Sequence, residues 1–314
     1  MIVLGAAGFI GSNITYELVK QGYDVVGIDN MATGFYGNVK NSRFDGLKGD
    51  FEFIRKDINI IDLYTEFKDG DIVFLLAALP RVQYSIDFPL ETNKNNITGL
   101  LNVLESARLA HVKKVIFSSS SSVYGGVAEF PTKETAHLSP KSPYAVHKAA
   151  GEYYCRVYGE IHGLDTVCLR YFNVFGVNQR AGSAYATVIP AFLEAAVNNG
   201  VCRIDGEGKA ERDFCYVDNV VQANILAAKH ESFLGGECFN IACGECYSVM
   251  DTYDEVCKLS GKQLNRVDAP RRQGDPLKSL ADISKAQNIL GYNPTVKFSE
   301  GMAKTYKWWE TGCK

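Results

Sequence analysis

The sequence has no long apolar run and no excess of charge of one sign. None of its hydrophobic stretches reaches about eighteen residues, so no membrane-spanning helix is expected. The formal net charge of −3 and the pI of about 6.0 exclude a broad electrostatic attraction to nucleic acid or to an anionic membrane. The chain opens on a short apolar segment at residues 2–4, without the basic stretch that begins a secretion signal. We therefore expect a cytoplasmic protein that binds neither nucleic acid nor membranes.

The sequence is also poor in arrangements that hold metals. Its five histidines are scattered, and none lies at ligand spacing from another. Among nine cysteines there is one close pair, Cys243 and Cys246, whereas a structural zinc site uses two such pairs. This pair does not lie at a strand-to-helix turn of the thioredoxin kind, which disfavours a redox role. We expect no metal, and reduced cysteines that serve as small core residues.

What the chain does contain is an alternation of strand-like and helix-like segments over its first two thirds. Short apolar runs predict strands, which we place at 24–28, 51–54, 72–76, 115–118 and 166–170. Amphipathic segments predict helices, which we place at 9–21, 91–110 and 144–162. This alternation predicts an α/β fold, a Rossmann doubly wound parallel sheet.

The rhythm of the sequence changes near residue 173. Glycine and polar residues cluster at 176–182 and 205–213, and prolines punctuate the later loops. We assign residues 1–173 to a Rossmann domain, to which later segments return. Residues 174–314 are assigned mainly to a smaller C-terminal substrate-binding region.

A glycine-rich segment lies between the first predicted strand and the first predicted helix. Gly5, Gly8 and Gly11, with Phe9 and Ile10 between them, have the spacing G-x-x-G-x-x-G. Such glycines permit a tight turn, close approach of the backbone to a pyrophosphate, and close packing of helix on strand. The N-terminus of the helix then presents free N–H groups and a partial positive charge to phosphates. The segment predicts a dinucleotide-binding turn.

An acidic residue ends the second predicted strand at the distance expected for such a turn. The carboxylate of Asp29 can accept hydrogen bonds from the hydroxyls of an adenosine ribose, and it would repel a 2′-phosphate. NAD is therefore favoured over NADP. The alternative is that Asp29 is only a turn residue.

The pattern Y-x-x-x-K occurs at Tyr144 and Lys148, within a predicted helix. Residues four apart share a helix face, so the phenol and the ammonium can reach the same ligand. A free tyrosine has a pKa near ~10 and is a poor base at neutral pH. A nearby ammonium and a positively charged nicotinamide ring stabilise the phenolate and lower that pKa, which predicts an acid–base role for Tyr144.

The predicted strand before this helix ends in a run of serines. Ser120 is delivered to the carboxyl edge of the sheet, where doubly wound folds bind their ligands. There its hydroxyl can hold a reacting hydroxyl of the substrate and relay its proton to Tyr144. The alternative for a serine run is an ordinary polar loop.

With these motifs in place, the chain resembles the extended short-chain dehydrogenase/reductase family, and within it the UDP-sugar 4-epimerases. The resemblance covers almost the whole chain through ordered motifs, which are Gly5–Gly11, Asp29–Asn30, Asp57–Ile58, Leu76–Ala78, Asn95–Gly99, Ser118–Gly125, Tyr144–Lys148, Arg170–Gly176, Arg212–Asp218 and Arg271–Asp275.

The resemblance implies roles for individual residues. It implies that Ser120, Tyr144 and Lys148 are catalytic. The positions that would contact NAD are Gly5, Gly8, Phe9, Ile10, Gly11, Asp29, Asn30, Thr33, Gly34, Asp57, Ile58, Ala77, Ala78, Asn96, Tyr144, Lys148 and Tyr171. The positions that would contact the nucleotide-sugar are Arg81, Ser120, Ser121, Tyr144, Asn173, Gln179, Thr187, Val188, Arg212, Arg272, Asp275 and Ser279. Arg212 and Arg272 suit a diphosphate, because a guanidinium keeps its charge and forks onto phosphate oxygens.

The reaction type follows from two serines. Related 4,6-dehydratases resemble this chain but have an Asp-Glu pair where it has Ser121 and Ser122. A hydroxyl cannot supply that acid and base, so elimination is disfavoured. Oxidation at C4 followed by return of the hydride predicts 4-epimerisation, with NAD regenerated in each cycle.

The resemblance is closest to epimerases that accept UDP-N-acetylglucosamine and UDP-N-acetylgalactosamine, with UDP-glucose and UDP-galactose as further substrates. It is strongest around residues 170–190, which include Gln179, and at Ser279. The chain departs from that subgroup at Pro80, Arg81 and Thr187. Arg81 could bind a carboxylate, which keeps UDP-glucuronate 4-epimerase as an alternative, alongside a dehydratase or reductase of the same family.

Two hypotheses from other classes remain. A reductase that releases its product would need exchangeable NADP, against which Asp29 argues. A non-catalytic NAD-binding regulator is disfavoured by the intact Ser120, Tyr144 and Lys148. The resemblance further implies a homodimer through a four-helix bundle, built from the two helices at 91–110 and 144–162. The apolar residues proposed for it are Ile97, Leu101, Leu104, Ala149, Tyr153 and Val157.

Overall fold

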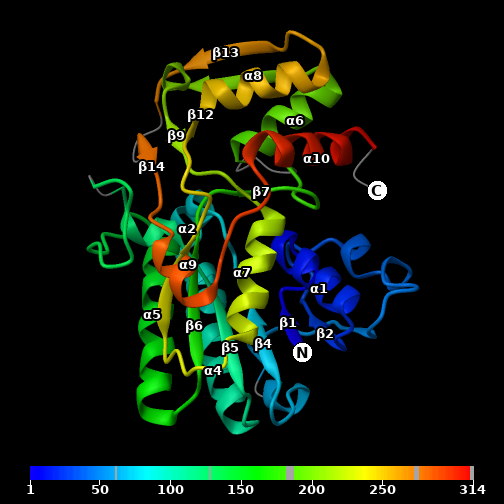
Figure 1. Ribbon diagram of the computed structural model, residues 1–314, viewed down its shortest axis with the longest axis vertical. Helices are drawn as coiled ribbons and strands as arrows, with labels where there is room; N and C mark the ends of the chain where they lie inside the picture. The colour runs from blue at the N-terminus through cyan, green and yellow to red at the C-terminus, as the bar shows by residue number, and fades with distance from the viewer. Residues whose placement is uncertain (61, 127–128, 182–186, 272–275, 312–314) are drawn as a thin grey trace.

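A parallel sheet forms the centre of the molecule (Figure 1). The computed structural model describes residues 1–60, 62–126, 129–181, 187–271 and 276–311. Seven strands pair in the order β11-β6-β5-β4-β1-β2-β3, all parallel. Their bounds are β1 Ile2–Leu4, β2 Val25–Ile28, β3 Phe51–Ile54, β4 Ile72–Leu75, β5 Lys114–Ser120, β6 Thr166–Tyr171 and β11 Glu237–Ile241. The predicted Rossmann-type fold is confirmed.

Alternate residues of the central strands enter two hydrophobic cores. Phe74 points into the core shared with helices α1 (Phe9–Gln21) and α7 (Val217–Lys229). Its neighbours Val73 and Leu75 point into the core on the other side of the sheet. Both faces of the sheet are therefore covered, which explains why these strands read as continuous apolar runs.

Helix α5 (Pro143–His162) shows how closely the local sequence sets an element. The Ser142 side chain accepts a hydrogen bond from the Ala145 N–H at 3.2 Å, and Pro143 occupies the first turn. Gly163 ends the helix in a left-handed conformation, with φ of 67°. The observed helix begins one residue before the predicted one.

The helix predicted at 91–110 is interrupted by a π-helical turn. The segment runs as α3 (Pro89–Asn93), the π turn η4 (Lys94–Thr98) and α4 (Gly99–Leu109). A π turn holds one more residue than an α turn and is frequent at functional sites. Periodicity alone did not predict it, because the apolar pattern on either side is helical.

The later part of the chain builds a second layer above one end of the sheet, where α6, α8 and α10 lie together in Figure 1. Its strands are short and pair in three small sheets. The remaining bounds are α2 Val82–Asp87, β7 Val174–Phe175, α6 Val188–Asn198, β8 Val201–Asp205, β9 Glu211–Arg212, β10 Cys215–Tyr216, β12 Tyr247–Ser248, α8 Val249–Ser260, β13 Asn265–Ala269, β14 Lys278–Ser279, α9 Ser284–Leu290 and α10 Phe298–Glu310. One segment, β11, returns to the edge of the main sheet beside β6.

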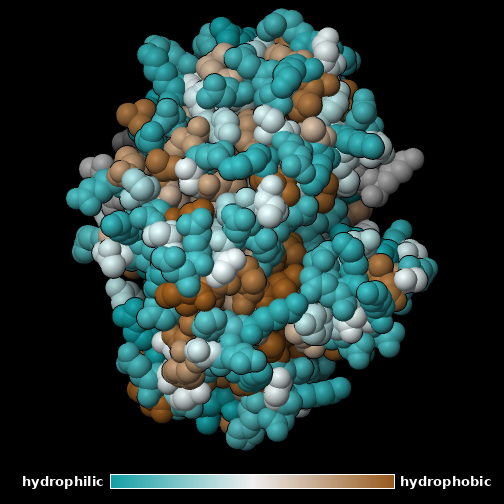
Figure 2. All heavy atoms as spheres, in the orientation of Figure 1, coloured by the Kyte–Doolittle hydropathy of each residue, from teal (hydrophilic) through white to brown (hydrophobic). Residues whose placement is uncertain are grey.

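Hydrophilic residues cover most of the face shown in Figure 2, and hydrophobic residues show in a smaller area near its centre. Within the residues described, the helices are too short or too polar to cross a membrane.

Candidate active site

The glycine-rich turn lies where β1 ends, next to the point at which the strand order of the sheet reverses. Gly5 has φ of +88°, and a Cβ there would lie 2.7 Å from the Ala77 nitrogen. A Cβ on Gly11 would lie 2.1 Å from the Gly5 carbonyl oxygen. Only glycine fits at both positions, so the turn is held tight against the chain that follows β4.

The start of α1 is open to an anion. Gly8 is the N-cap residue and supplies no side-chain hydrogen bond, and the first turn carries no acidic residue. The first N–H groups of a helix lack intrahelical partners and lie at the positive end of its dipole. A pyrophosphate fits these N–H groups, as the sequence predicts.

Asp29 is fixed to the glycine-rich turn by hydrogen bonds. Its carboxylate accepts the Ala7 N–H at 3.0 Å and the Met31 N–H at 2.7 Å. Burial raises the pKa of Asp29, and the two backbone hydrogen bonds counteract part of this. Gly34 packs closely here, since a Cβ on it would lie 2.6 Å from the Ala7 Cβ. A carboxylate has about four acceptor sites, so it retains capacity for ribose hydroxyls.

Four of the positions predicted to contact NAD lie at or just after the ends of β2 and β3. Asn30 donates to the Asp57 carboxylate at 2.8 Å, and Asn59 donates to it from both its backbone and its side chain. Burial raises the pKa of Asp57, but these hydrogen bonds outweigh it and the net pKa is lowered. Ile58, next in the chain, is buried against Gly99. Thr33, in the loop after β2, is exposed.

The π turn positions the chain that leaves β4. Asn96 accepts the Leu79 N–H at 2.8 Å and donates to the Leu79 carbonyl at 3.1 Å. Ala77 and Ala78 precede Leu79 and pass beside the glycine-rich turn. The cofactor residues predicted at the carboxyl ends of β1 to β4 therefore come together along one edge of the sheet, and their geometry fits NAD.

The three predicted catalytic residues converge between β5 and α5. Ser120 ends β5, while Tyr144 and Lys148 lie one turn apart in α5. The Lys148 ammonium donates to the Ser118 carbonyl at 2.6 Å and lies 5.7 Å from the centre of the Tyr144 ring. Lys148 is 4% exposed and Tyr144 is 9% exposed.

Burial shifts both titratable groups of this set. It raises the pKa of Tyr144 to about 12, and a hydrogen bond with Ser120 lowers it in part. Burial lowers the pKa of Lys148 to about 8. Tyr144 is therefore a protonated phenol at neutral pH until more positive charge approaches its ring. A cationic nicotinamide supplies such charge, which is the arrangement that acid–base catalysis by tyrosine requires.

A residue absent from the sequence predictions holds the start of α5. Ser85, in α2, accepts the Tyr144 N–H at 3.0 Å and donates to the Val82 carbonyl at 2.6 Å. The Ser85 N–H is bound in turn by the Arg81 carbonyl at 3.0 Å. The backbone of Arg81 is thus held one helical turn before Ser85, the residue that contacts Tyr144. No local pattern signalled Ser85, because the two residues lie 59 positions apart.

Three predicted substrate residues meet on the other side of the site. Asn173 donates to the Ser279 hydroxyl at 3.0 Å, although the two are 106 positions apart. Ser279 lies opposite Arg212 in the parallel pairing of β14 with β9. The backbones of the two strands are also joined by a hydrogen bond from the Asp213 N–H to the Ser279 carbonyl at 2.8 Å.

Asp213, also missed by the sequence analysis, holds this side together. Its fully buried carboxylate accepts the N–H groups of Cys243, Gly244 and Ala281, at 2.9, 3.0 and 3.2 Å. Burial raises the pKa of Asp213 to about 6, and these three hydrogen bonds counteract part of the rise. One carboxylate thereby joins two distant segments, one after β11 and one after β14.

The remaining predicted residues have fewer contacts with the groups described above. Gln179 donates to the Val174 carbonyl at 3.2 Å, and its buried Oε1 has no partner among the described residues. Thr187 is exposed at the N-cap of α6, next to the half-buried Val188. The Tyr171 hydroxyl exchanges hydrogen bonds with Asn224 of α7, so that side chain is engaged inside the fold.

Ser121 is half-buried in the short helix η5 (Ser121–Tyr124) directly after Ser120. Arg272 and Asp275 lie outside the described residues. The eight cysteines that the structure describes carry free thiols. Within the described part of the chain, no group of three His, Cys, Asp or Glu side chains gathers as metal ligands would.

Comparisons with known proteins agree with this geometry. The model of the NAD dependent epimerase/dehydratase family matches residues 1–242. A UDP-glucose 4-epimerase of Mycolicibacterium smegmatis is 35% identical over 308 residues, which cover 97% of this chain and 96% of that protein.

Two solved structures show the same fold over nearly the whole chain. A UDP-N-acetylglucosamine 4-epimerase from Methanobrevibacter ruminantium, in complex with UDP-N-acetylmuramic acid, is 38% identical with a TM-score of 0.93, covering 99% of this chain and 97% of that one. A UDP-glucuronic acid 4-epimerase from Bacillus cereus, in complex with UDP-glucuronic acid and NAD, is 34% identical with a TM-score of 0.89, covering 99% and 98%.

The predicted cofactor, NAD, and the predicted enzyme class are thereby confirmed. The glycine-rich turn and Asp29 lie at the carboxyl ends of β1 and β2, and Ser120 lies at the end of β5 near Tyr144 and Lys148 of α5. The chain belongs to the NAD-dependent epimerase/dehydratase family.

Proposed function

We propose that this protein interconverts UDP-hexoses by epimerisation at C4, with UDP-N-acetylglucosamine and UDP-N-acetylgalactosamine as substrates and UDP-glucose and UDP-galactose as further ones. The observation that carries the proposal is the convergence of half-buried Ser120 with buried Tyr144 and Lys148, at the carboxyl edge of the same sheet that carries the glycine-rich turn. All three relatives described above are named 4-epimerases of UDP-sugars.

The glycine-rich turn that begins at Gly5 and the carboxylate of Asp29 would hold NAD, which would accept the hydride from C4 of the sugar and then return it. Tyr144 takes the proton of the 4-hydroxyl and later returns it. Lys148 stabilises the phenolate, and Ser120 orients the hydroxyl that reacts. Between the two hydride transfers the 4-keto sugar rotates in its pocket. It then presents the opposite face of C4 to the returning hydride, so the configuration at C4 is inverted.

The side chains that follow Ser120 favour epimerisation over elimination. Ser121 and Ser122 are hydroxyl residues, and the Ser122 hydroxyl is buried with no partner among the described residues. Neither can act as the carboxylic acid and carboxylate that remove water from the 4-keto sugar. The 4-keto sugar is therefore reduced again by hydride transfer rather than dehydrated.

The preference for an N-acetylated sugar rests on Ser279. Its side chain is small and lies against Asn173 at the substrate side of the site. A small residue here leaves room for an acetamido group at C2, and its hydroxyl can bind that group.

A second candidate, UDP-glucuronate, is favoured by Arg81. This half-buried cation sits at the N-cap of α2, one helical turn from the Ser85 contact with Tyr144. A guanidinium pairs well with a carboxylate, and that carboxylate would be C6 of the sugar.

The deciding experiment is incubation of the purified protein with UDP-N-acetylglucosamine, UDP-glucose and UDP-glucuronate separately, with products identified by NMR. We expect the 4-epimers of the first two, without loss of water or carbon dioxide. A 4-keto-6-deoxy product would contradict epimerisation, and activity on UDP-glucuronate alone would overturn the preference based on Ser279.

We further propose a homodimer formed through α4 and α5. The support is a row of exposed apolar side chains along α5, in which Val146, Tyr153, Val157 and Ile161 are 49%, 59%, 41% and 70% exposed. Such a row is costly to leave in water. A second copy that covers it would complete a four-helix bundle.

Two residues suggested for that interface do not belong to it. Leu104 is fully buried and Ala149 is 7% exposed, and both pack within the chain. Light scattering should give a dimer mass for the wild type. Replacement of Tyr153 and Val157 by lysine should give a monomer mass, and a wild-type monomer would contradict the proposal.

A further inference from the structure

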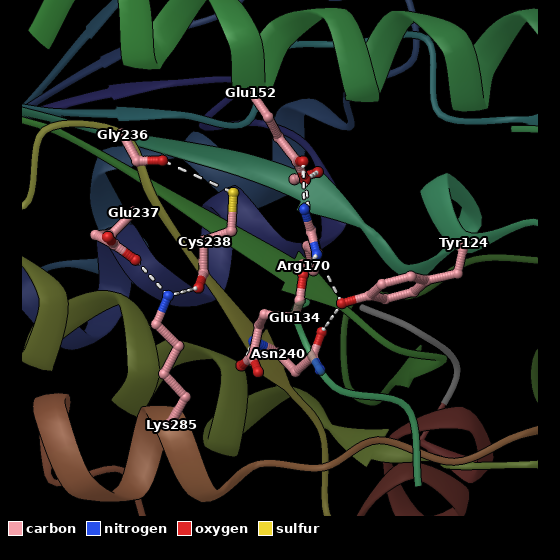
Figure 3. A network of polar contacts seen from close by, with 10 residues as sticks. Tyr124, Glu134, Glu152, Arg170, Gly236, Glu237, Cys238, Asn240 and Lys285 are labelled. Atoms are coloured by element: carbon pink, nitrogen blue, oxygen red, sulfur yellow. Dashed lines mark hydrogen bonds and ion pairs between the residues drawn. The ribbon is translucent and has the colours of Figure 1, made fainter. Parts of the chain in front are cut away.

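A buried network of polar side chains adjoins the catalytic residues in β5 and α5, and Figure 3 shows Glu152 and Tyr124 both pointing toward Arg170. Arg170 of β6 binds Glu152 of α5 as a fork, with Nε to Oε1 at 2.8 Å and Nη2 to Oε2 at 2.7 Å. Ser119 of β5 donates to the same Oε1 at 2.5 Å. Arg170 and Glu152 are each 5% exposed.

The other side of Arg170 extends the network across the sheet edge. Its Nη1 donates to the Tyr124 hydroxyl at 2.8 Å and to the Glu134 carbonyl at 3.1 Å. Tyr124 donates in turn to Asn240 of β11 at 2.6 Å. Every link joins a different segment of the chain, so the network fixes these segments relative to one another.

Three of these segments, β5, α5 and η5, also carry or directly adjoin a proposed catalytic residue. Ser119 immediately precedes Ser120, and Glu152 follows Lys148 by one turn of α5. Tyr124 ends the short helix η5, whose N-cap is Ser120. A displacement of β5 against α5 would therefore change the contact between Ser120 and Tyr144.

From this geometry we infer that Glu152 and Arg170 are positioning residues for the catalytic step, an inference that rests on the proposed function. Among the described residues, neither forms a hydrogen bond with Tyr144 or Ser120, while the charge of Glu152 opposes in part the lowering of the Lys148 pKa by burial. They hold β5 and α5 in the register that lets Ser120 meet Tyr144. Small errors of placement in reacting groups lower the rate of the chemical step far more than they change binding.

The chain contains a matched control at the opposite end of the same two strands. Lys114 begins β5 and pairs at 3.2 Å with Asp165, which directly precedes β6. Their side chains are 2% and 12% exposed, so this ion pair is also buried. It joins the same two strands as the Arg170 network, far along them from Ser120 and Tyr144.

The test compares Glu152→Gln with Asp165→Asn, each an isosteric loss of one carboxylate charge. Both variants should have lower melting temperatures. We expect Glu152→Gln to lose about tenfold or more in kcat, with KM for the UDP-sugar changed less than about threefold and NAD content unchanged. Asp165→Asn should keep its kcat. Equal effects of the two variants on kcat, or no loss in Glu152→Gln, would overturn the inference.

A second readout does not depend on turnover. The phenolate absorbance of Tyr144, obtained by subtracting the Tyr144→Phe titration, should move to higher pH in Glu152→Gln, because the hydrogen bond from Ser120 holds that pKa down. Asp165→Asn should leave it in place. An unmoved titration in Glu152→Gln would also overturn the inference.

If Glu152→Gln does not fold, Ser119→Ala and Tyr124→Phe remove single links of the network and should lower kcat in the same direction. Unchanged kcat in both would count against the inference. A wild type inactive on every UDP-sugar would refute the proposed function alone, since the titration still tests the positioning role.

Discussion

The two sides of the active site are built on very different supports. The catalytic side stands on the seven-residue strand β5 and the twenty-residue helix α5. The substrate side stands on the paired strands β9 and β14, each of two residues, and the Asp213 carboxylate fixes the segments that follow β11 and β14. Long elements fix a geometry that the chemistry cannot vary. Short strands allow the lining of a pocket to change at little cost to the fold, and the proposed activity on more than one UDP-sugar would depend on this.

The largest expected effect of a substitution is on the catalytic side. Tyr144→Phe should lower kcat by about 10² to 10⁴-fold on every sugar, because it removes the general acid–base. NAD content should not change. Ser120→Ala should cost less, since the sugar hydroxyl can still reach the phenol. Steady-state rates on UDP-N-acetylglucosamine and UDP-glucose check both, and a near-normal rate in Tyr144→Phe would refute the catalytic assignment.

The cofactor turn should tolerate almost no change. Gly5→Ala should destabilise the fold by about 2 kcal/mol, from the left-handed conformation and the approach to Ala77, and should release NAD. Gly163→Ala is the matched control, because Gly163 also has positive φ, of 67°, but open space around it. It should cost about 1 kcal/mol and keep its NAD. Denaturant melts and the nucleotide content after gel filtration measure the two effects; the wild type should carry NAD without any addition, and NADP in its place would contradict the role of Asp29.

On the substrate side a large change should be tolerated by the fold but not by one class of sugar. Ser279→Tyr should fill the space beside Asn173, and so lower kcat/KM for UDP-N-acetylglucosamine at least about tenfold relative to UDP-glucose. Thermal stability should stay near that of the wild type. A ratio unchanged by the substitution would show that Ser279 does not line the pocket.

The smallest expected effect is a dependence on pH that belongs to the substrate side. Burial raises the pKa of Asp213 to about 6, above the ~3.9 of an unfolded aspartate. Above pH 6 both states are ionised and the folded state bears the cost of a buried charge. Between about pH 6 and 4 the folded state binds the proton first, so that cost is relieved as the pH falls.

The free energy of unfolding of the wild type, relative to Asp213→Asn, should therefore rise by about 1 kcal/mol from pH 7 to pH 5. Guanidinium unfolding of both proteins at the two pH values measures it. A difference that stays constant, or that falls, would show that Asp213 does not titrate in this range.

The sequence predicts the two sides of the site unequally, for a physical reason. Glycine spacing, strand ends and the Tyr144 to Lys148 spacing act within one or two elements, so a local pattern reveals them. Ser85 and Asp213 act through contacts across at least 30 positions, and no pattern signals those. The meeting of Asn173 with Ser279 came from the family resemblance rather than from any spacing. Glu152 could have been predicted from the sequence, because it lies four residues after Lys148 on the same helix.

The place of β11 in the sheet has a consequence for how the protein is made. The three residues proposed to be catalytic are in the chain once residue 148 has been added, but Asn240, which binds Tyr124, comes much later. The Asn240 side chain also donates to the carbonyl of Asp282 at 3.1 Å. At about 5–20 residues per second, a ribosome needs roughly ten seconds to cover the stretch from the catalytic helix to Asp282. During that interval Tyr124 lacks its partner at the sheet edge, so the nascent chain holds the proposed catalytic side chains before the network that positions them is complete.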